Sequence, residues 1–522
     1  MTRPMKFRTL VLIVLAAVAA AVAAGCGGGG DSAPSPATVA PPDTPVYVEV
    51  AVRPEAEVSA DVNALAKSIA GIDDVGDLVV EELEKSANDS GEPVDFAKEI
   101  EPWLGEKAGI FLQEYDGNEF DSYGAAVQTT DAGAAEEFID RQTRVATPAA
   151  KDGSFDGVDY KVEADGQTLG VIGDLVVLSE DEKTFHEAIE ASADESLADR
   201  ESFNDAIDAA SGDGFAQVFV DIGGLVKQAG GQIDAEAELF LESAGIAPKN
   251  ATAVASVLPS SNQVEIDFAS NVGSKPPTGD ASQLLGSLPG GSFAAVASAD
   301  FGARFGEAIS RLGAEGIPGS LEPGELEGAL GALGIDVKKL SASITGFGVF
   351  AEGNTENNVT GAAVLTTSDS AEATKVIVQV GKLLRLSGTR GVTALSGDTS
   401  GFSVRSPEIG SQPLVVAAKG DRIAISYGLA ASAAALSATS GASLAEDPAY
   451  EEAVAALGDS PITGFLDGPA ALRFFTDVAA NSENDQSFEA AKPYLEKIAF
   501  AGIGAGSDGE LSTAKVIVGF SE

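Results

Sequence analysis

The sequence predicts an α+β fold made of two homologous modules, each a curved antiparallel sheet with helices packed on one face. Short strand patterns follow one another through tight turns, which favours antiparallel pairing. Segments with helical periodicity lie between some of these strands. The 522-residue chain also matches itself at a nearly constant offset, which indicates one module repeated in tandem.

The first module opens with a strand pattern and two helical patterns. Apolar and polar residues alternate from Val46 to Arg53, which predicts a half-buried strand. Helices are expected from Val62 to Ile69 and from Asp73 to Lys85. The second helix begins with acidic residues and ends near a lysine, as the helix dipole favours.

The rest of the module alternates strands and helices. Ser179-Glu-Asp-Glu182 predicts a capping box, and the helix that it opens has Phe185, Ala188 and Ile189 on its apolar face. The other expected elements are paired strands at 109–114 and 124–130, a helix from Asp131, three strands within 158–179, a strand at 215–220, helical segments within 222–244 and a hairpin at 251–269.

Internal matches locate the second module. Gly173-Asp-Leu-Val-Val-Leu-Ser179 aligns with Gly420-Asp-Arg-Ile-Ala-Ile-Ser426 at an offset of 247, and Ser196-Leu-Ala-Asp199 aligns with Ser443-Leu-Ala-Glu446 at the same offset. These matches predict five segments: a lipoprotein signal peptide at 1–25, a flexible Gly/Ser/Pro tether at 26–42, module 1 at 43–272, a linker at 273–280 and module 2 at 281–522.

The N-terminal segment predicts export. Three basic residues precede Leu10 to Ala24, an apolar run of 15 residues that is too short to span a bilayer. Ala23-Ala24-Gly25-Cys26 resembles the bacterial lipobox, which implies acylation of Cys26 and cleavage before it. The alternative is an ordinary secretory signal in which Cys26 is incidental. We expect a cell-membrane protein anchored by lipid on the extracytoplasmic face.

The chain also resembles a known family. The features that carry the resemblance are the lipobox, the stretch Asp95-Phe-Ala-Lys-Glu-Ile-Glu-Pro-Trp-Leu-Gly105, the turn Gly157-Val-Asp-Tyr160, and Ser196-Leu-Ala-Asp before Phe203. Together they resemble the bacterial lipoprotein family catalogued as domain of unknown function 3352. The resemblance covers nearly all of 43–522 and implies export and a duplicated α+β body. It brings no catalytic residues.

Composition excludes several kinds of chemistry. One His and one Cys cannot form a Cys/His zinc site or an internal disulfide. His186 is the single possible imidazole base, but Ala433 occupies the matching position in module 2, so we interpret His186 as an exposed helix residue. Trp103 could stack on a ligand, but its module 2 counterpart Ile344 is also apolar, which favours core packing.

Other motifs do not meet the patterns of calcium or dinucleotide sites. Two acidic segments lack the calcium-loop pattern: Asp116-Gly-Asn-Glu-Phe-Asp121 and Asn88-Asp-Ser-Gly-Glu92. We interpret them as solvated acidic turns, with weak binding of a cation as the alternative. Gly502-Ile-Gly-Ala-Gly506 lies between strand patterns, so it does not meet the context of a dinucleotide loop. Two suitably spaced carboxylates would suffice for a hydrolase, and sequence spacing cannot find that pair among 80 acids.

Negative charge is concentrated in one module. The whole chain has a formal charge of −48. Residues 43–280 hold 51 acidic and 14 basic residues, a charge of −37, whereas residues 281–522 hold 28 and 15, a charge of −13. Without a basic cluster, binding to nucleic acid is not expected.

The expected function is a pair of non-enzymatic binding or scaffolding modules in the cell envelope, with no cofactor or metal and with an unknown envelope ligand or protein as partner. The alternative is a carboxylate-based envelope hydrolase acting on a glycan or a peptide. Two facing carboxylates in a cleft, one with a raised pKa, would favour the hydrolase. An apolar cavity between sheet and helices would favour a binder of lipids or small molecules.

Overall fold

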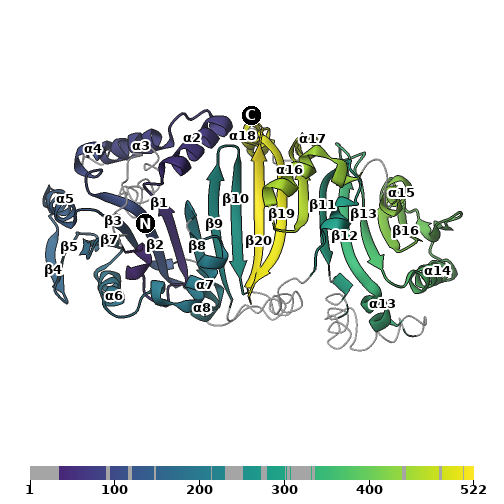
Figure 1. Cartoon of the computed structure of the whole chain (residues 1–522), viewed down its shortest axis with the longest axis horizontal. Helices are drawn as coiled ribbons and strands as arrows, with labels where there is room; N and C mark the ends of the chain where they lie inside the picture. Colours follow the sequence, from purple (N-terminus) through teal and green to yellow (C-terminus); the bar gives the residue numbers. More distant parts are fainter. Residues whose placement is uncertain are drawn as a thin grey trace. The chain divides into compact units, whose positions relative to one another are not determined.

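A computed structural model describes most of the chain after residue 33. The described residues are 34–89, 94–115, 120–145, 149–212, 214–229, 251–271, 279–299, 301–302, 306, 331, 336–437, 443–480, 485–509 and 511–521. The predicted signal peptide, Cys26 and most of the predicted linker lie outside these residues, as do residues 116–119 and 90–92 of the two acidic turns. The fold is α+β, with antiparallel strands and helices (Figure 1).

The chain divides into two compact units. Unit 1 comprises Met1–Ser274 with Asp508–Thr513 and Glu522, and unit 2 comprises Lys275–Ser507 with Ala514–Ser521.

The strands of unit 1 pair antiparallel in the order β4-β5-β6-β7-β3-β2-β1-β8-β9-β10. Their bounds are β1 (Val46–Ala51), β2 (Leu104–Tyr115), β3 (Phe120–Thr129), β4 (Lys151–Phe155), β5 (Val158–Val162), β6 (Thr168–Ile172), β7 (Leu175–Ser179), β8 (Ala216–Asp221), β9 (Thr252–Ser260) and β10 (Gln263–Ser270). The predicted strand pairs, the three short strands and the closing hairpin are therefore confirmed.

The described helices of unit 1 are η2 (Pro36–Val39), α2 (Ala56–Ala70), α3 (Val75–Asp89), α4 (Phe96–Glu99), α5 (Ala132–Val145), α6 (Glu182–Ala193), η3 (Leu197–Asp199), α7 (Glu201–Ala209) and α8 (Ile222–Gln228). Phe185, Ala188 and Ile189 of α6 are buried, as the helical pattern predicts. The predicted capping box at Ser179 is wrong. Asp181 caps α6 instead, because its carboxylate accepts a hydrogen bond from the backbone N–H of Thr184 at 2.8 Å.

Strand β1 buries the face that was expected to be exposed, which corrects the prediction of a half-buried strand with that face in water. Tyr47 and Glu49, on the face expected to be wet, are 2% and 7% exposed. The segment η2 covers this face: Ala37, Val39 and Ala40 share a core with Tyr47. The hydroxyl of Ser35 also donates a hydrogen bond to Glu49 Oε2 at 2.9 Å.

The predicted tether at 26–42 is therefore too long. Ala37, Val39 and Ala40 belong to the core of unit 1, and Arg200 donates a hydrogen bond to the carbonyl oxygen of Pro42 at 3.2 Å. Residues 26–33 of that segment lie outside the described residues.

Helices cover both faces of the sheet in unit 1, which corrects the expectation of one covered face. Phe185 of α6 packs against Val177 of β7. Ile139 of α5 packs against Leu178, the next residue along β7. Because successive side chains of a strand point to opposite faces, α5 and α6 lie on opposite sides of the sheet.

The strands of unit 2 pair antiparallel in the order β14-β15-β16-β17-β13-β12-β11-β18-β19-β20, the order seen in unit 1 with each strand number raised by ten. Their bounds are β11 (Ser292–Ala299), β12 (Ile344–Glu352), β13 (Thr360–Thr367), β14 (Val392–Ala394), β15 (Ser400–Val404), β16 (Leu414–Lys419), β17 (Arg422–Tyr427), β18 (Ile462–Asp467), β19 (Ile498–Asp508) and β20 (Leu511–Phe520).

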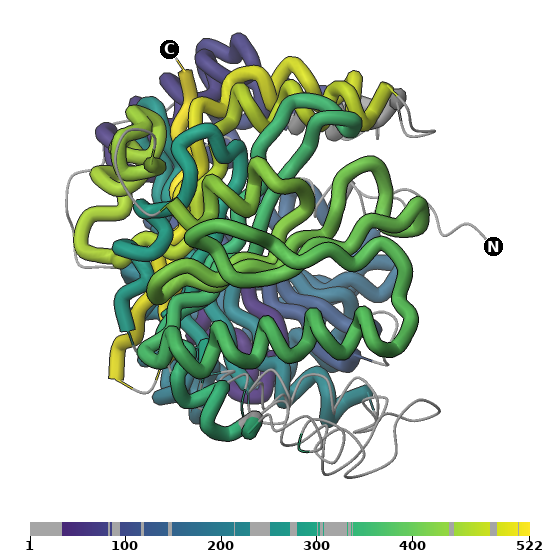
Figure 2. Tube along the Cα trace, turned by 90° about the vertical axis from the view of Figure 1, so that its right-hand side faces the viewer, coloured from purple at the N-terminus to yellow at the C-terminus, as the bar shows by residue number. Residues whose placement is uncertain are grey.

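The described helices of unit 2 are α10 (Ser282–Gly286), α13 (Val337–Ser343), α14 (Ser370–Leu386), α15 (Leu429–Leu436), η5 (Leu444–Glu446), α16 (Pro448–Leu457), α17 (Gly468–Ala480) and α18 (Asp485–Leu495). Here too, helices lie on both faces of the sheet. Ala417 of β16 shares a core with Ala435 of α15, whereas its neighbour Ala418 shares a core with Ile377 of α14. Figure 2, which faces this end of unit 2, shows α14 below the strands.

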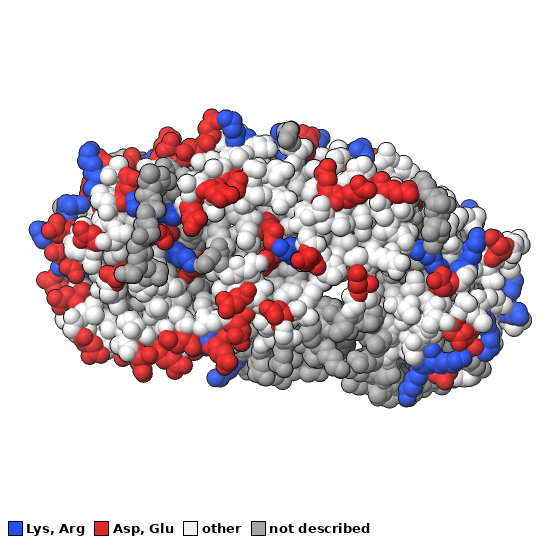
Figure 3. Space-filling view, viewed as in Figure 1, with Lys and Arg blue, Asp and Glu red and all other residues white. Residues whose placement is uncertain are grey.

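Acidic side chains gather on one rim of unit 1. On the face drawn in Figure 3, Asp and Glu follow the lower edge of this unit, near α6. Glu187, Glu190, Asp194 and Glu195 of this region line a shallow hollow of about 370 Å³. Lys183 of α6 pairs with Glu114 at 2.5 Å and with Glu187 at 3.2 Å, so the rim also holds a cation.

Candidate functional site

His186 belongs to an aromatic cluster and is not the exposed helix residue that we expected. Its ring stacks on Phe155, with the ring centroids 4.0 Å apart. The hydroxyl of Tyr160 donates a hydrogen bond to Glu182 at 2.7 Å and lies 2.7 Å from Nε2 of His186. With a side chain 28% exposed, His186 is partly buried among these partners.

Trp103 lies in the core of unit 1, as predicted. It is 6% exposed, and its ring packs beside Phe138 with the ring centroids 5.7 Å apart. The indole N–H donates a hydrogen bond to the carbonyl oxygen of Glu99 at 2.6 Å. This placement leaves no open ring face for a ligand.

The remaining sequence candidates do not form a site. In the part of the chain that the structure describes, no three His, Cys, Asp or Glu side chains come together as metal ligands. Gly502 to Gly506 lies inside β19, so it is not a turn between a strand and a helix. Burial raises the pKa of the Glu352 carboxyl group, but Glu352 lines neither of the clefts described next.

The candidate site surrounds the short helix α10 at the start of unit 2. Leu285 and Leu288 are fully buried and fix the segment against the sheet. Asp280 Oδ1 accepts a hydrogen bond from the backbone N–H of Ser282 at 2.7 Å. The hydroxyl and backbone N–H of Ser282 lower the pKa of Asp280, so this carboxylate is ionised at neutral pH.

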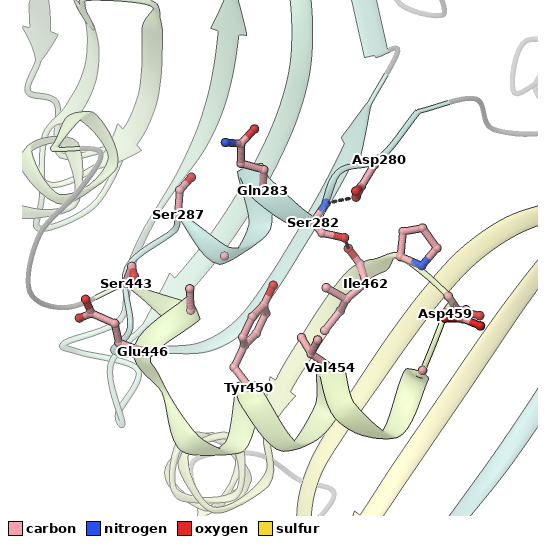
Figure 4. A pocket seen from close by; sticks show the side chains of 15 residues that line it. Asp280, Ser282, Gln283, Ser287, Ser443, Glu446, Tyr450, Val454, Asp459 and Ile462 are labelled. Atoms are coloured by element: carbon pink, nitrogen blue, oxygen red, sulfur yellow. Dashed lines mark hydrogen bonds between the residues drawn. The ribbon is translucent and has the colours of Figure 1, made fainter.

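One side of α10 forms the Tyr450 cleft, with a volume of about 680 Å³. Figure 4 shows the ring of Tyr450 directed from α16 toward α10, with Glu446 on one side and Asp459 on the other. Burial, with a smaller contribution from Asp280, raises the pKa of Tyr450 to about 12, so its hydroxyl is neutral. The lining includes Ser282, Gln283, Ser443 and Val454, which is a mixture of hydrogen-bonding and apolar groups.

The other side of α10 forms the Arg422 cleft, with a volume of about 460 Å³. Asp280, Gln283 and Ser287 line both clefts. The hydroxyl groups of Thr345 and Thr366, both in the lining, are hydrogen-bonded to each other at 2.9 Å. The lining also contains Asp421 and Arg422.

Arg422 is a buried cation, only 8% exposed. It donates one hydrogen bond to Ser287 Oγ at 2.5 Å and one to the carbonyl oxygen of Ala435 at 3.2 Å. Burial lowers its pKa, and the nearby charge of Asp421 opposes this shift. Because an arginine is protonated at any physiological pH, Arg422 brings a positive charge to the lining of the cleft.

Sequence reasoning missed this site, although one signal for it was present. In the internal alignment, Arg422 matches Leu175, which is 1% exposed in the core of unit 1. A charged residue opposite a core leucine indicates that the fold does not require the charge. The clefts depend on α10, whose five residues carry too weak a helical pattern to be found by periodicity.

The family model for proteins of unknown function, DUF3352, matches residues 8–517 of the chain. The chain belongs to the DUF3352 family. This membership confirms the family resemblance inferred from sequence and assigns no activity. No curated protein matches this DUF3352 chain.

Solved structures with similarity to this DUF3352 member include two of TP0453. Crystal form III has 8% sequence identity and a TM-score of 0.25, with 47% of this chain and 82% of the TP0453 chain covered. Crystal form I has 9% identity and a TM-score of 0.17, with 78% and 97% covered. Among the described helices, none is both long and apolar enough to cross a bilayer.

Proposed function

We propose that this protein is a lipid-anchored, extracytoplasmic member of the cell envelope that binds a small molecule without chemically changing it. The two clefts around α10 carry this proposal. Their volumes fall within the range of small-molecule sites, and they combine apolar walls with a few polar groups and a buried cation. Such a lining favours selective binding.

A hydrolase has less support. It would need a cleft in which two carboxylates face each other, one of them with a raised pKa. Asp280, which lines both clefts, has a lowered pKa and accepts a hydrogen bond from Ser282. Glu352, whose pKa is raised, lines neither of them.

We also propose that units 1 and 2 are homologous modules derived from a tandem duplication. Their identical strand order supports this. So does a matching backbone hydrogen bond of 2.8 Å, from Leu197 N–H to Ala40 O in unit 1 and from Leu444 N–H to Leu288 O in unit 2. In this scheme, η2 and α10 are counterparts, and the clefts belong to the second copy.

Ligand binding can be tested by purifying the detergent-solubilised protein from its native envelope and analysing the co-purifying lipids, glycans and other small molecules. Val454 is 39% exposed and lines the Tyr450 cleft, so Val454→Arg would obstruct the cleft without burying a charge. Leu386→Arg on α14, where the leucine is 85% exposed, is the matched control. We expect a molecule that co-purifies with the wild type and the control and is lost with Val454→Arg. Recovery of nothing with the wild type would contradict the proposal, and equal recovery with all three proteins would exclude the Tyr450 cleft as the binding place.

Anchoring can be tested separately with Cys26→Ser. This change removes the thiol that the acyl chains would occupy, so the processed protein is expected to leave the membrane fraction. The measurement is fractionation followed by mass spectrometry of the N-terminus. If processed Cys26→Ser protein still sediments with membranes, the lipobox interpretation is wrong.

A further inference from the structure

The guanidinium of Arg422 has N–H donors that no described residue accepts from. An arginine has five N–H bonds, and the two described hydrogen bonds, to Ser287 and to Ala435, use two of them. Among the described residues, no carboxylate lies within ion-pair distance of this group. Three N–H bonds of this buried cation therefore have no partner among the described residues, and Arg422 lines the Arg422 cleft.

Ser287 holds Arg422 in place. Its hydroxyl accepts the hydrogen bond from Arg422 and donates its own hydrogen to the carbonyl oxygen of Leu284 at 2.7 Å. The backbone hydrogen bonds of Leu197 and Leu444 end at Ala40 and Leu288, so the preceding residues, Val39 in unit 1 and Ser287 in unit 2, are counterparts. Unit 1 thus has an apolar pair, Val39 and Leu175, in one core where unit 2 has a serine and an arginine.

The charges of the Arg422 cleft fit neither a simple anion nor a simple cation. Arg422 would attract a carboxylate or a phosphate, preferably through a pair of parallel hydrogen bonds. Asp280 and Asp421 line the same cleft and would repel a purely anionic ligand. A ligand that carries both signs of charge satisfies all three groups.

We propose that the Arg422 cleft binds a small zwitterion, whose carboxylate or phosphate pairs with Arg422 and whose ammonium group faces Asp280 and Asp421. The hydroxyl pair of Thr345 and Thr366 supplies further hydrogen bonds to the ligand. This inference rests on the proposed binding function and specifies the chemical class of the ligand. The volume of the Arg422 cleft, about 460 Å³, suits an amino acid or a phosphoethanolamine head group.

The test measures binding to the full chain, purified in detergent, by isothermal titration and ligand-observed NMR. One pair of probes is alanine and glycerophosphoethanolamine, which separates a free amino acid from a lipid head group. The single-charge fragments acetate, inorganic phosphate and ethanolamine are the comparison. We expect at least one zwitterion to bind about tenfold or more tightly than its fragments.

Variants assign the binding to Arg422. Arg422→Leu restores the unit 1 residue and is expected to weaken zwitterion binding at least about tenfold, whereas Arg385→Leu, an exposed arginine on α14, is expected to leave it unchanged. If Arg422 served only to hold α15 through its hydrogen bond to Ala435, the two variants would bind the zwitterion equally well. Unchanged binding in Arg422→Leu, fragments that bind as well as the zwitterions, or no binding of either zwitterion would overturn the inference. If another molecule still co-purifies in a manner sensitive to Val454→Arg, the proposed function survives without this ligand class.

Discussion

Arg422 and Leu175, which match in the internal alignment, show that two sheets with the same strand order hold a charged side chain at one such position and an aliphatic one at the other. Both are almost fully buried in their own units. A buried charge is costly unless it is paired, whereas a leucine at the same place contributes to the core. The sequence motif around the two residues is otherwise similar, so the difference lies in what each side chain faces.

This contrast predicts unequal effects of exchanging the two residues. Leu175→Arg is expected to destabilise unit 1 by about 3–5 kcal/mol, because it buries a cation without a partner. Arg422→Leu is expected to change the stability of unit 2 by no more than about 1 kcal/mol, since the lost hydrogen bonds to Ser287 and Ala435 are offset by removal of a buried charge. Urea unfolding followed by far-UV circular dichroism measures both. Equal losses would contradict the idea that Arg422 is dispensable for folding.

Buried tyrosines predict a loss of stability at alkaline pH. Burial raises the pKa of Tyr123, Tyr160 and Tyr450 to about 12, above the usual value of 10.0. The folded state therefore favours the neutral phenols; this contribution is complete below pH 10 and is lost as the pH rises to about 12. Tyrosinate absorbance recorded with circular dichroism should show that these groups ionise together with unfolding. Ionisation near pH 10 in a chain that is still folded would contradict this.

His186 shows why single residues were harder to predict than their helices. Helical periodicity placed it correctly beside the apolar face of α6. Its partners Phe155 and Tyr160 belong to β4 and β5, and both residues precede His186 by 26 or more positions in the chain. A pattern along one helix carries no information about which strands pack against it.

At the scale of elements, the strands were predictable and their surroundings were not. Alternation and short turns located β5 to β7 and the hairpin of β9 and β10, because both signals are local. The burial of β1 depends on η2, which lies in a stretch rich in serine, proline and alanine, residues 31–42, with the composition of a linker. Its three buried small apolar residues are too few to predict a packed element.

The packing of η2 predicts sensitivity where a tether would tolerate change. Val39→Asp would bury an unpaired carboxylate and is expected to destabilise unit 1 by about 3 kcal/mol or more. Thr38→Asp, at the adjacent half-buried position, is expected to have a much smaller effect. Trp103, the single tryptophan, lies in unit 1, so thermal unfolding followed by its fluorescence measures this difference. Similar midpoints for the two variants would show that η2 contributes little.

At the scale of the whole molecule, two sheets with the same strand order lie in parts of the chain that differ strongly in charge. Residues 43–280 carry −37 and residues 281–522 carry −13. Composition was enough to find this asymmetry, but not the clefts, which arise where α10 meets strands and helices distant in the chain. A shared strand order is compatible with both charges, so the acidity is a property of the surface and not of the fold.

The asymmetry predicts different responses to salt. Raising NaCl from about 10 mM to about 1 M shortens the Debye length from about 30 Å to about 3 Å and screens repulsion among surface charges. Trp103 fluorescence follows the thermal unfolding of unit 1, and a second transition seen by circular dichroism would follow unit 2. We expect added salt to raise the midpoint temperature of unit 1 by more than that of unit 2. A larger shift for unit 2 would be the opposite of this expectation.

The packing of η2 also determines how far the body can lie from a bilayer. If Cys26 carries the acyl chains, nine residue steps separate it from Ser35, whose hydroxyl is bonded to Glu49. Nine steps span roughly 30 Å when fully extended and about 16 Å on average for a flexible chain. At physiological salt, that average is about two Debye lengths, so the negative charge of unit 1 and that of anionic lipids would be largely screened from each other. The acidic unit would therefore lie close to the lipid head groups, within reach of molecules that leave or enter the membrane surface.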